Sequence, residues 1–66
     1  METVNEKVRN WRKTQKMTLK TAATVLELSP SYLSEIETGK RDFTSAVIRK
    51  YLAAAPDFFE ANDFYQ

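Results

Sequence analysis

The 66-residue sequence predicts a compact all-α domain made of five short helices. Apolar residues recur at helical spacing through most of the chain, and no stretch alternates apolar and polar residues as a strand would. Residues that favour helix caps stand directly before these periodic stretches. The length suits a single domain, so we expect residues 1–66 to fold as one unit.

The first two helices follow from capping residues and apolar spacing. A helix is predicted over about residues 3–16, with Thr3 as its cap and inward residues at i, i+4 and i+7. These inward residues are Val4, Val8 and Trp11. Thr18 is suited to cap a second helix over residues 19–26, whose inward residues are Ala22, Ala23 and Leu26. A turn is expected at Glu27 and Leu28.

The sequence indicates both the start and the end of a third helix. Ser29 suits the N-cap, Pro30 suits the first helical position, and Gly39, the only glycine, suits the end. The helix is therefore predicted over residues 30–38. Leu33 and Ile36 lie three residues apart and form its buried stripe.

The last third of the chain is predicted to form two more helices. A loop over residues 40–43 leads to Thr44, which can cap a fourth helix ending at Ala54. Its inward residues are Val47, Ile48, Tyr51, Leu52 and Ala55. Pro56 interrupts that helix, and residues 57–65 are predicted to form a short fifth helix.

Composition excludes several classes of function. The chain has no Cys and no His, so disulfides and the common zinc sites are excluded, and we expect no metal and no cofactor. No Gly-rich phosphate loop and no acid pair at a cleft is evident, so we expect no enzyme activity. The N-terminus carries no apolar run, so we expect neither a signal peptide nor a membrane span. The missing cysteines are compatible with a cytoplasmic location.

Charge is divided unevenly along the chain. Residues 1–50 hold all ten Lys and Arg against six acidic residues, whereas residues 51–66 hold three acidic residues and no basic one. This division predicts a mildly basic face on the first three quarters and an acidic, aromatic C-terminal element.

The second and third helices, joined by about three residues, form a helix-turn-helix arrangement. Over roughly residues 4–55 the chain resembles the Cro/phage-repressor type of helix-turn-helix, the Xre family. The residues that match this family's pattern are Arg12, Thr18, Ala23, Ser29, Leu33, Ser34, Ile36, Glu37, Gly39, Lys40 and Arg41. The predicted fold is thus a Cro/repressor-like helix-turn-helix domain with its core at about residues 18–38.

Three positions depart from the family pattern. Leu19 stands where a phosphate-holding Gln is usual, Glu27 where the turn usually has Gly, and Phe43 where Pro is common after the basic loop. Glu27 is interpreted as a tolerated turn variant. Leu19 removes one expected DNA contact and is compatible with a protein-facing surface.

The resemblance implies that helix 30–38 enters the major groove of DNA. Base contacts are expected from Pro30, Ser31, Tyr32, Ser34 and Glu35. For Tyr32, contact with a phosphate and packing under the helix are equally open. Phosphate contacts are expected from Thr18, Lys20, Thr21, Ser29, Lys40 and Arg41. The resemblance also implies a structural ion pair between Arg12 and Glu37.

A small domain without disulfides is stabilised most readily by self-association. The tail carries four aromatic residues, more than one short helix needs for packing. Some of them are expected to pack against the first and fourth helices, and the homodimer interface is expected among the same four residues. They are Phe58, Phe59, Phe64 and Tyr65.

The predicted function is a sequence-specific transcriptional regulator, a repressor, that binds a palindromic operator in double-stranded DNA as a dimer. A phage, plasmid or other mobile element is the expected origin. An antitoxin that represses its own operon and a restriction–modification controller protein are alternatives with the same fold. A protein-interaction module that has lost DNA binding is the alternative of a different class.

Overall fold

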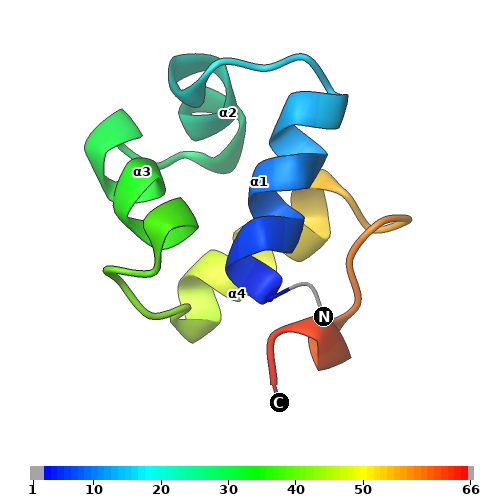
Figure 1. The fold of residues 1–66 in the computed structure, drawn as a ribbon. Helices are drawn as coiled ribbons and strands as arrows, with labels where there is room; N and C mark the ends of the chain where they lie inside the picture. The colour runs from blue at the N-terminus through cyan, green and yellow to red at the C-terminus, as the bar shows by residue number, and fades with distance from the viewer. Residues whose placement is uncertain (1–2, 66) are drawn as a thin grey trace.

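The computed structural model describes residues 3–65 and contains four α-helices and one short 3-10 helix within that range (Figure 1). The elements are α1 (Val4–Thr14), α2 (Leu19–Leu26), α3 (Pro30–Thr38), α4 (Ser45–Ala54) and the 3-10 helix η1 (Ala61–Asp63). The described residues form no strand. The all-α class is confirmed, but the prediction of five helices is wrong, because residues 57–65 form only one 3-10 turn.

All four α-helices begin where the capping residues predicted. In each case the cap hydroxyl oxygen accepts a hydrogen bond from the backbone N–H three residues further on, which satisfies one otherwise unpaired donor. The four caps are Thr3, Thr18, Ser29 and Thr44. At Thr3, the Glu6 side chain accepts from the cap's own N–H and completes a capping box.

Helix α1 ends at Thr14, two residues before the predicted end. Gln15 is the C-cap, and Lys16 adopts a left-handed conformation with φ of 58°. A residue in that region cannot continue a right-handed helix. The backbone N–H of Met17 then donates to the carbonyl of Arg12 at 3.1 Å, which closes the turn toward α2.

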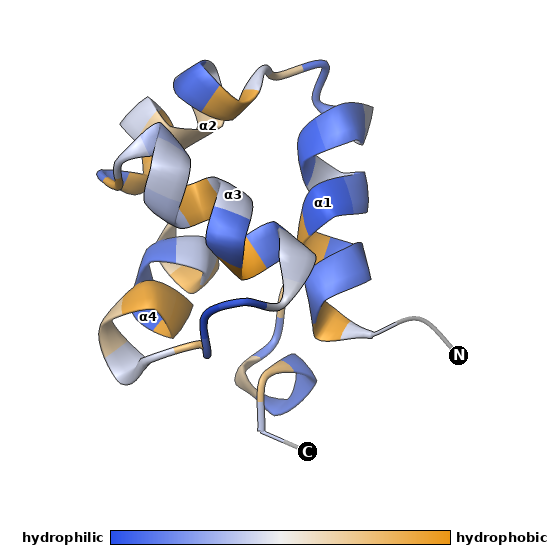
Figure 2. Cartoon of the chain, turned by 60° about the vertical axis from the view of Figure 1, so that its left-hand side comes forward, coloured by the Kyte–Doolittle hydropathy of each residue, from blue (hydrophilic) through white to orange (hydrophobic). Residues whose placement is uncertain are grey.

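The core lies where the four helices meet (Figure 2). Val8, Ala22, Leu33 and Ile36 have no exposed surface, and Leu26 is 1% exposed. The remaining core residues are Trp11, Ala23, Val47, Ile48, Tyr51 and Phe59. In Figure 2 the hydrophobic colouring of α3 lies toward the other helices, so one face of α3 is free for other contacts.

The tail folds back against α1 and α4 through a turn at residues 56–58 and the 3-10 helix η1. Phe59 is only 2% exposed and lies edge-on to both Trp11 and Tyr51, with ring centroids 5.6 and 5.4 Å apart. Phe64 packs against Phe43 at 5.3 Å. Glu60 is extended, with φ of −118° and ψ of 152°, so the chain can aim both rings inward although they are five residues apart. A continuous helix at that spacing would point them in different directions.

One ion pair fixes the tail to α1. The Lys7 ammonium lies 3.0 Å from a carboxylate oxygen of Asp63 and within 6 Å of the Phe58 and Phe59 ring centroids. The other carboxylate oxygen of Asp63 accepts from the backbone N–H of Glu60 at 2.8 Å. That hydrogen bond, and next the bond to Lys7, lower the pKa of Asp63. No helix among residues 3–65 has the length and apolar character needed to cross a membrane.

Candidate nucleic-acid interface

Helices α2 and α3 are joined by a turn of three residues, Glu27 to Ser29. Glu27 is left-handed with φ of 57°, and its N–H donates to the carbonyl of Thr24 at 3.2 Å. The N–H of Leu28 donates to the carbonyl of Ala23 at 2.8 Å, which satisfies the end of α2. The buried Leu33 then fastens α3 across α2, so the two helices form a helix-turn-helix.

A buried ion pair sets the orientation of α3 relative to α1. The guanidinium of Arg12 donates to both carboxylate oxygens of Glu37, from Nε at 2.8 Å and from Nη2 at 3.1 Å. Its Nη1 donates to the carbonyl of Met17 at 2.9 Å. The side chains of Arg12 and Glu37 are 14% and 5% exposed, so the structure brings the implied pair together away from solvent.

Asn5 adds a second connection that the sequence analysis missed. Its side-chain Nδ2 donates to the backbone carbonyl of Ile36 at 2.7 Å. Asn5 precedes Arg12 by seven residues, which is two helical turns, so both lie on the same face of α1. That spacing was the available signal for a contact with α3.

The outward face of α3 carries the residues expected to contact bases. Pro30 and Ser31 are exposed, while Tyr32, Ser34 and Glu35 are half-buried. Helical geometry places Ser31 and Glu35 opposite the buried stripe, with Tyr32 and Ser34 on either flank. Ser34 lines a shallow hollow that also contains Leu19 and Arg12. Tyr32 packs partly against the core, which favours the packing interpretation of this residue.

Two of the predicted DNA-contacting residues pair with each other. The Nε of Arg41 donates to Oε2 of Glu35 at 2.5 Å, and the Arg41 guanidinium lies 5.5 Å from the centre of the Tyr32 ring. The hydrogen bond to Glu35, and next the negative charge of Glu35, raise the pKa of Arg41 above its ordinary value. Both side chains remain accessible, Arg41 being 56% and Glu35 40% exposed.

The remaining residues expected at phosphates are exposed. They are Thr18, Lys20, Thr21, Ser29 and Lys40. Thr18 and Ser29 cap α2 and α3, so their hydroxyl oxygens accept hydrogen bonds within the domain. Backbone N–H groups at helix N-termini attract phosphate oxygens, and Lys20 and Lys40 add mobile positive charge.

The structure explains the departures at Leu19 and Phe43. Leu19 is half-buried and packs against the core, so its side chain replaces a polar contact with an apolar one. Phe43 packs against both Tyr51 and Phe64, with ring centroids 6.1 and 5.3 Å away. An aromatic residue at this position therefore holds the tail, which a Pro would not do.

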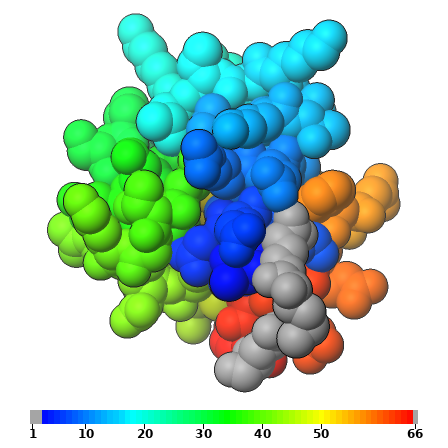
Figure 3. Space-filling view, in the orientation of Figure 1, coloured from blue at the N-terminus to red at the C-terminus, as the bar shows by residue number. Residues whose placement is uncertain are grey.

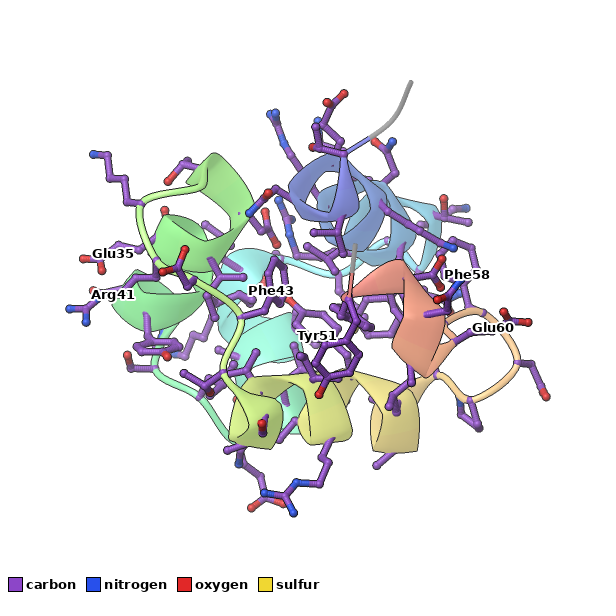
Figure 4. The ribbon with its side chains drawn as sticks, turned by 90° about the horizontal axis from the view of Figure 1, so that it is seen from below. Glu35, Arg41, Phe43, Tyr51, Phe58 and Glu60 are labelled. Carbon is purple, nitrogen blue, oxygen red and sulfur yellow. The ribbon has the colours of Figure 1, made fainter. Side chains whose placement is uncertain are left out.

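The acidic tail and the candidate DNA face lie at opposite sides of the domain. In Figure 4, Glu35 and Arg41 lie at one edge and Phe58 and Glu60 at the other. The space-filling view of Figure 3 shows the same separation, with α2 and α3 (cyan to green) on one side and the tail (orange to red) on the other. This separation keeps the carboxylates of the tail away from a bound phosphate backbone.

The comparison with protein families agrees with this geometry. A family model described as "Helix-turn-helix" matches residues 8–55. The chain belongs to the Cro/C1-type helix-turn-helix family. The predicted resemblance is thereby confirmed, and the domain is that of a DNA-binding regulator. Comparisons with curated proteins and with solved structures find no match.

The matched range divides this helix-turn-helix protein into two parts. It contains α2, α3 and the Arg12–Glu37 pair, and it stops before Pro56. The aromatic tail therefore lies outside the family pattern, although Phe59 completes the core of the domain.

Proposed function

We propose that this helix-turn-helix protein is a sequence-specific transcriptional repressor that places α3 in the major groove of double-stranded DNA. The observation that carries the proposal is the outward face of α3. Ser31 is exposed there beside Pro30, and the basic residues Lys40 and Arg41 follow directly after the helix. An exposed helix with short polar side chains fits the groove and can hydrogen-bond to base edges.

The proposed contacts divide by chemistry. Ser31 reads a base edge, and Pro30 offers an apolar contact to a thymine methyl. Lys20 and Lys40 neutralise phosphates, and the N-termini of α2 and α3 contribute backbone N–H groups near Thr18, Thr21 and Ser29. Ser34 lies on the flank of α3, beside the hollow that Leu19 also lines. It therefore contacts DNA only if the edge of the major groove reaches the side of α3 that faces α2.

Binding to a palindromic operator requires a dimer, and the tail supports one. Phe58 is 43% and Tyr65 60% exposed, and Phe58 lies at the edge of the domain opposite Glu35 and Arg41 (Figure 4). Phe59 and Phe64 are committed to the domain's own packing, so the proposed interface narrows to Phe58 and Tyr65. The domain measures 27 × 25 × 23 Å, so two adjacent copies can place their α3 helices about 34 Å apart, one turn of DNA.

The alternative of a protein-interaction module rested on Leu19 and on the low net charge of +1. Leu19 packs against the core instead of forming an exposed apolar patch, so that support is reduced. An antitoxin or a restriction–modification controller would use the same DNA contacts, and the neighbouring genes would distinguish them. All three regulators act in the bacterial cytoplasm or nucleoid.

Selection of bound duplexes from random DNA tests the proposal. We expect enrichment of an inverted repeat, and a changed preference at one or two base pairs for Ser31→Ala. Lys40→Ala should weaken binding to all sequences alike. With Lys20 and Lys40 of each copy neutralising phosphates, the affinity of the dimer should fall with salt at a log–log slope of about −4. If wild-type protein enriches no sequence, the proposed function is refuted.

A further inference from the structure

Arg41 is held against the recognition face by three contacts. Its backbone N–H and that of Lys40 donate to the carbonyl of Glu35, at 3.3 and 2.8 Å, after the chain reverses at Gly39. Its guanidinium is bonded through Nε to the carboxylate of Glu35 and lies over the ring of Tyr32. Tyr32 and Glu35 are one turn apart on α3, so the guanidinium is directed along the helix toward its N-terminal half.

The same contacts leave one edge of the guanidinium available. Nε is occupied by Glu35, whereas no hydrogen bond within residues 3–65 engages the two terminal nitrogens. These nitrogens present parallel N–H groups, which match the O6 and N7 acceptors of guanine in the major groove. A guanidinium already directed by these contacts loses less conformational entropy when it meets the base than an unpaired arginine would.

The carboxylate of Glu35 distinguishes between a base and a phosphate as the target of Arg41. A phosphate at the guanidinium would lie close to Glu35, and the two negative charges would repel each other. A guanine edge carries no net charge, so the Glu35 carboxylate repels it much less than it repels a phosphate. Lys40 is exposed and forms no ion pair within the described range, so it is the better phosphate contact of the two.

We propose that Arg41 is a specificity-determining residue that reads a guanine in the major groove, and that Glu35 and Tyr32 position it. This inference rests on the proposed DNA-binding function and changes the expected roles of two residues within it. Arg41 becomes a base contact instead of a phosphate contact, and Glu35 becomes a positioning residue instead of a base contact.

The test measures dissociation constants for the duplex selected by the wild type and for copies in which each guanine in turn is replaced by 7-deazaguanine. This replacement keeps base pairing and removes only the N7 acceptor. For the wild type we expect a loss of about 5- to 100-fold at one guanine per half-site. Arg41→Lys keeps the charge but loses the fixed pair of parallel N–H groups, so the penalty at that guanine should become smaller.

Glu35 variants separate positioning from direct reading. Glu35→Ala should reduce the penalty at the same guanine, and Glu35→Gln, which keeps an acceptor for Nε, should restore part of it. Affinity for unrelated DNA should stay equal or rise, because a negative charge is removed from the interface. Arg49→Lys is the matched control, because Arg49 is an exposed arginine of α4 that forms no ion pair in the described range and should leave the guanine penalty unchanged.

Each contrary result has a distinct meaning. If Arg41→Lys keeps the guanine penalty and weakens all duplexes alike, Arg41 is a phosphate contact and the inference fails while the proposed function stands. If Glu35→Ala shifts preference at a different base pair, Glu35 reads a base itself and its positioning role fails. If the wild type selects no sequence, the proposed function fails and the inference with it. Thermal melting of every variant checks that the domain remains folded.

Discussion

Removal of the Arg12 side chain should be among the most damaging single substitutions in this protein. In Arg12→Ala the carboxylate of Glu37, 5% exposed, loses both of its hydrogen bonds from Arg12. The carbonyl of Met17 also loses its donor. Breaking a buried ion pair from one side costs about 3–5 kcal/mol, because the remaining charge is left buried without a partner.

That cost is large relative to the stability of so small a domain. At about 0.05–0.15 kcal/mol per residue, 66 residues provide a free energy of unfolding of about 3–10 kcal/mol. A loss of about 3 kcal/mol corresponds to a fall in Tm of about 12–24 °C for a domain of this size. Urea unfolding and thermal melting, followed by far-UV circular dichroism, measure both quantities.

A double-mutant cycle identifies the cause of the loss. Arg12→Met combined with Glu37→Leu removes both charges, so the double variant should be more stable than the sum of the two single losses predicts. Arg9→Ala, an exposed basic residue one turn earlier on α1, should change the free energy of unfolding by less than about 0.5 kcal/mol. The reasoning is refuted if Arg12→Ala costs less than about 1 kcal/mol, or if the two single losses add without coupling.

Three further substitutions test particular features of the fold. Glu27→Gly should stabilise the domain by about 1 kcal/mol in urea unfolding, because Glu27 has a left-handed φ of 57° that glycine adopts without strain; an unchanged midpoint would contradict this. Tyr51→Phe should retain or increase stability by up to about 1 kcal/mol, because the Tyr51 hydroxyl is buried with no hydrogen-bond partner among the described residues; a loss above about 1 kcal/mol would show that it has one. Asp63→Asn should lower Tm near pH 7, and the difference from the wild type should vanish as pH falls below about 4. The reason is that the folded state lowers the pKa of Asp63, so the ionised carboxylate stabilises the domain above its unfolded pKa and that contribution is lost on protonation; a pH-independent difference would contradict this.

Local sequence patterns did not predict which aromatic rings of the tail are buried. Four aromatic residues within residues 57–65 predicted a fifth helix, with some rings packed inward and others at a dimer surface, but not which ring does which; the structure draws Phe59 into the core and leaves Phe58 exposed. Phe59 fits against Trp11 and Tyr51, which lie 48 and 8 residues earlier in the chain. Whether a ring turns inward depends on the space left between helices that are distant in sequence. The residues next to the ring in sequence do not determine that space.

At the candidate DNA face, too, some features could be predicted from the sequence and others could not. The outward residues of α3 could be named from helical spacing, but the pairing of Arg41 with Glu35 could not. Their separation of six residues spans the end of the helix, so the contact depends on how the chain reverses at Gly39. The structure also shows that Leu19 packs inward, which the resemblance had left open.

The sequence by itself determined the all-α class, the four capped helix starts, the buried stripe of α3 and the helix-turn-helix family. These features depend on interactions between residues three or four apart, or on a pattern that the family shares, so they can be recognised along the chain. The tertiary structure alone decided the path of the tail, the contact of Asn5 with α3 and the orientation of Arg41. Those features arise from packing between segments that meet only after the domain has folded, where the space and charge around each side chain are set by remote parts of the chain.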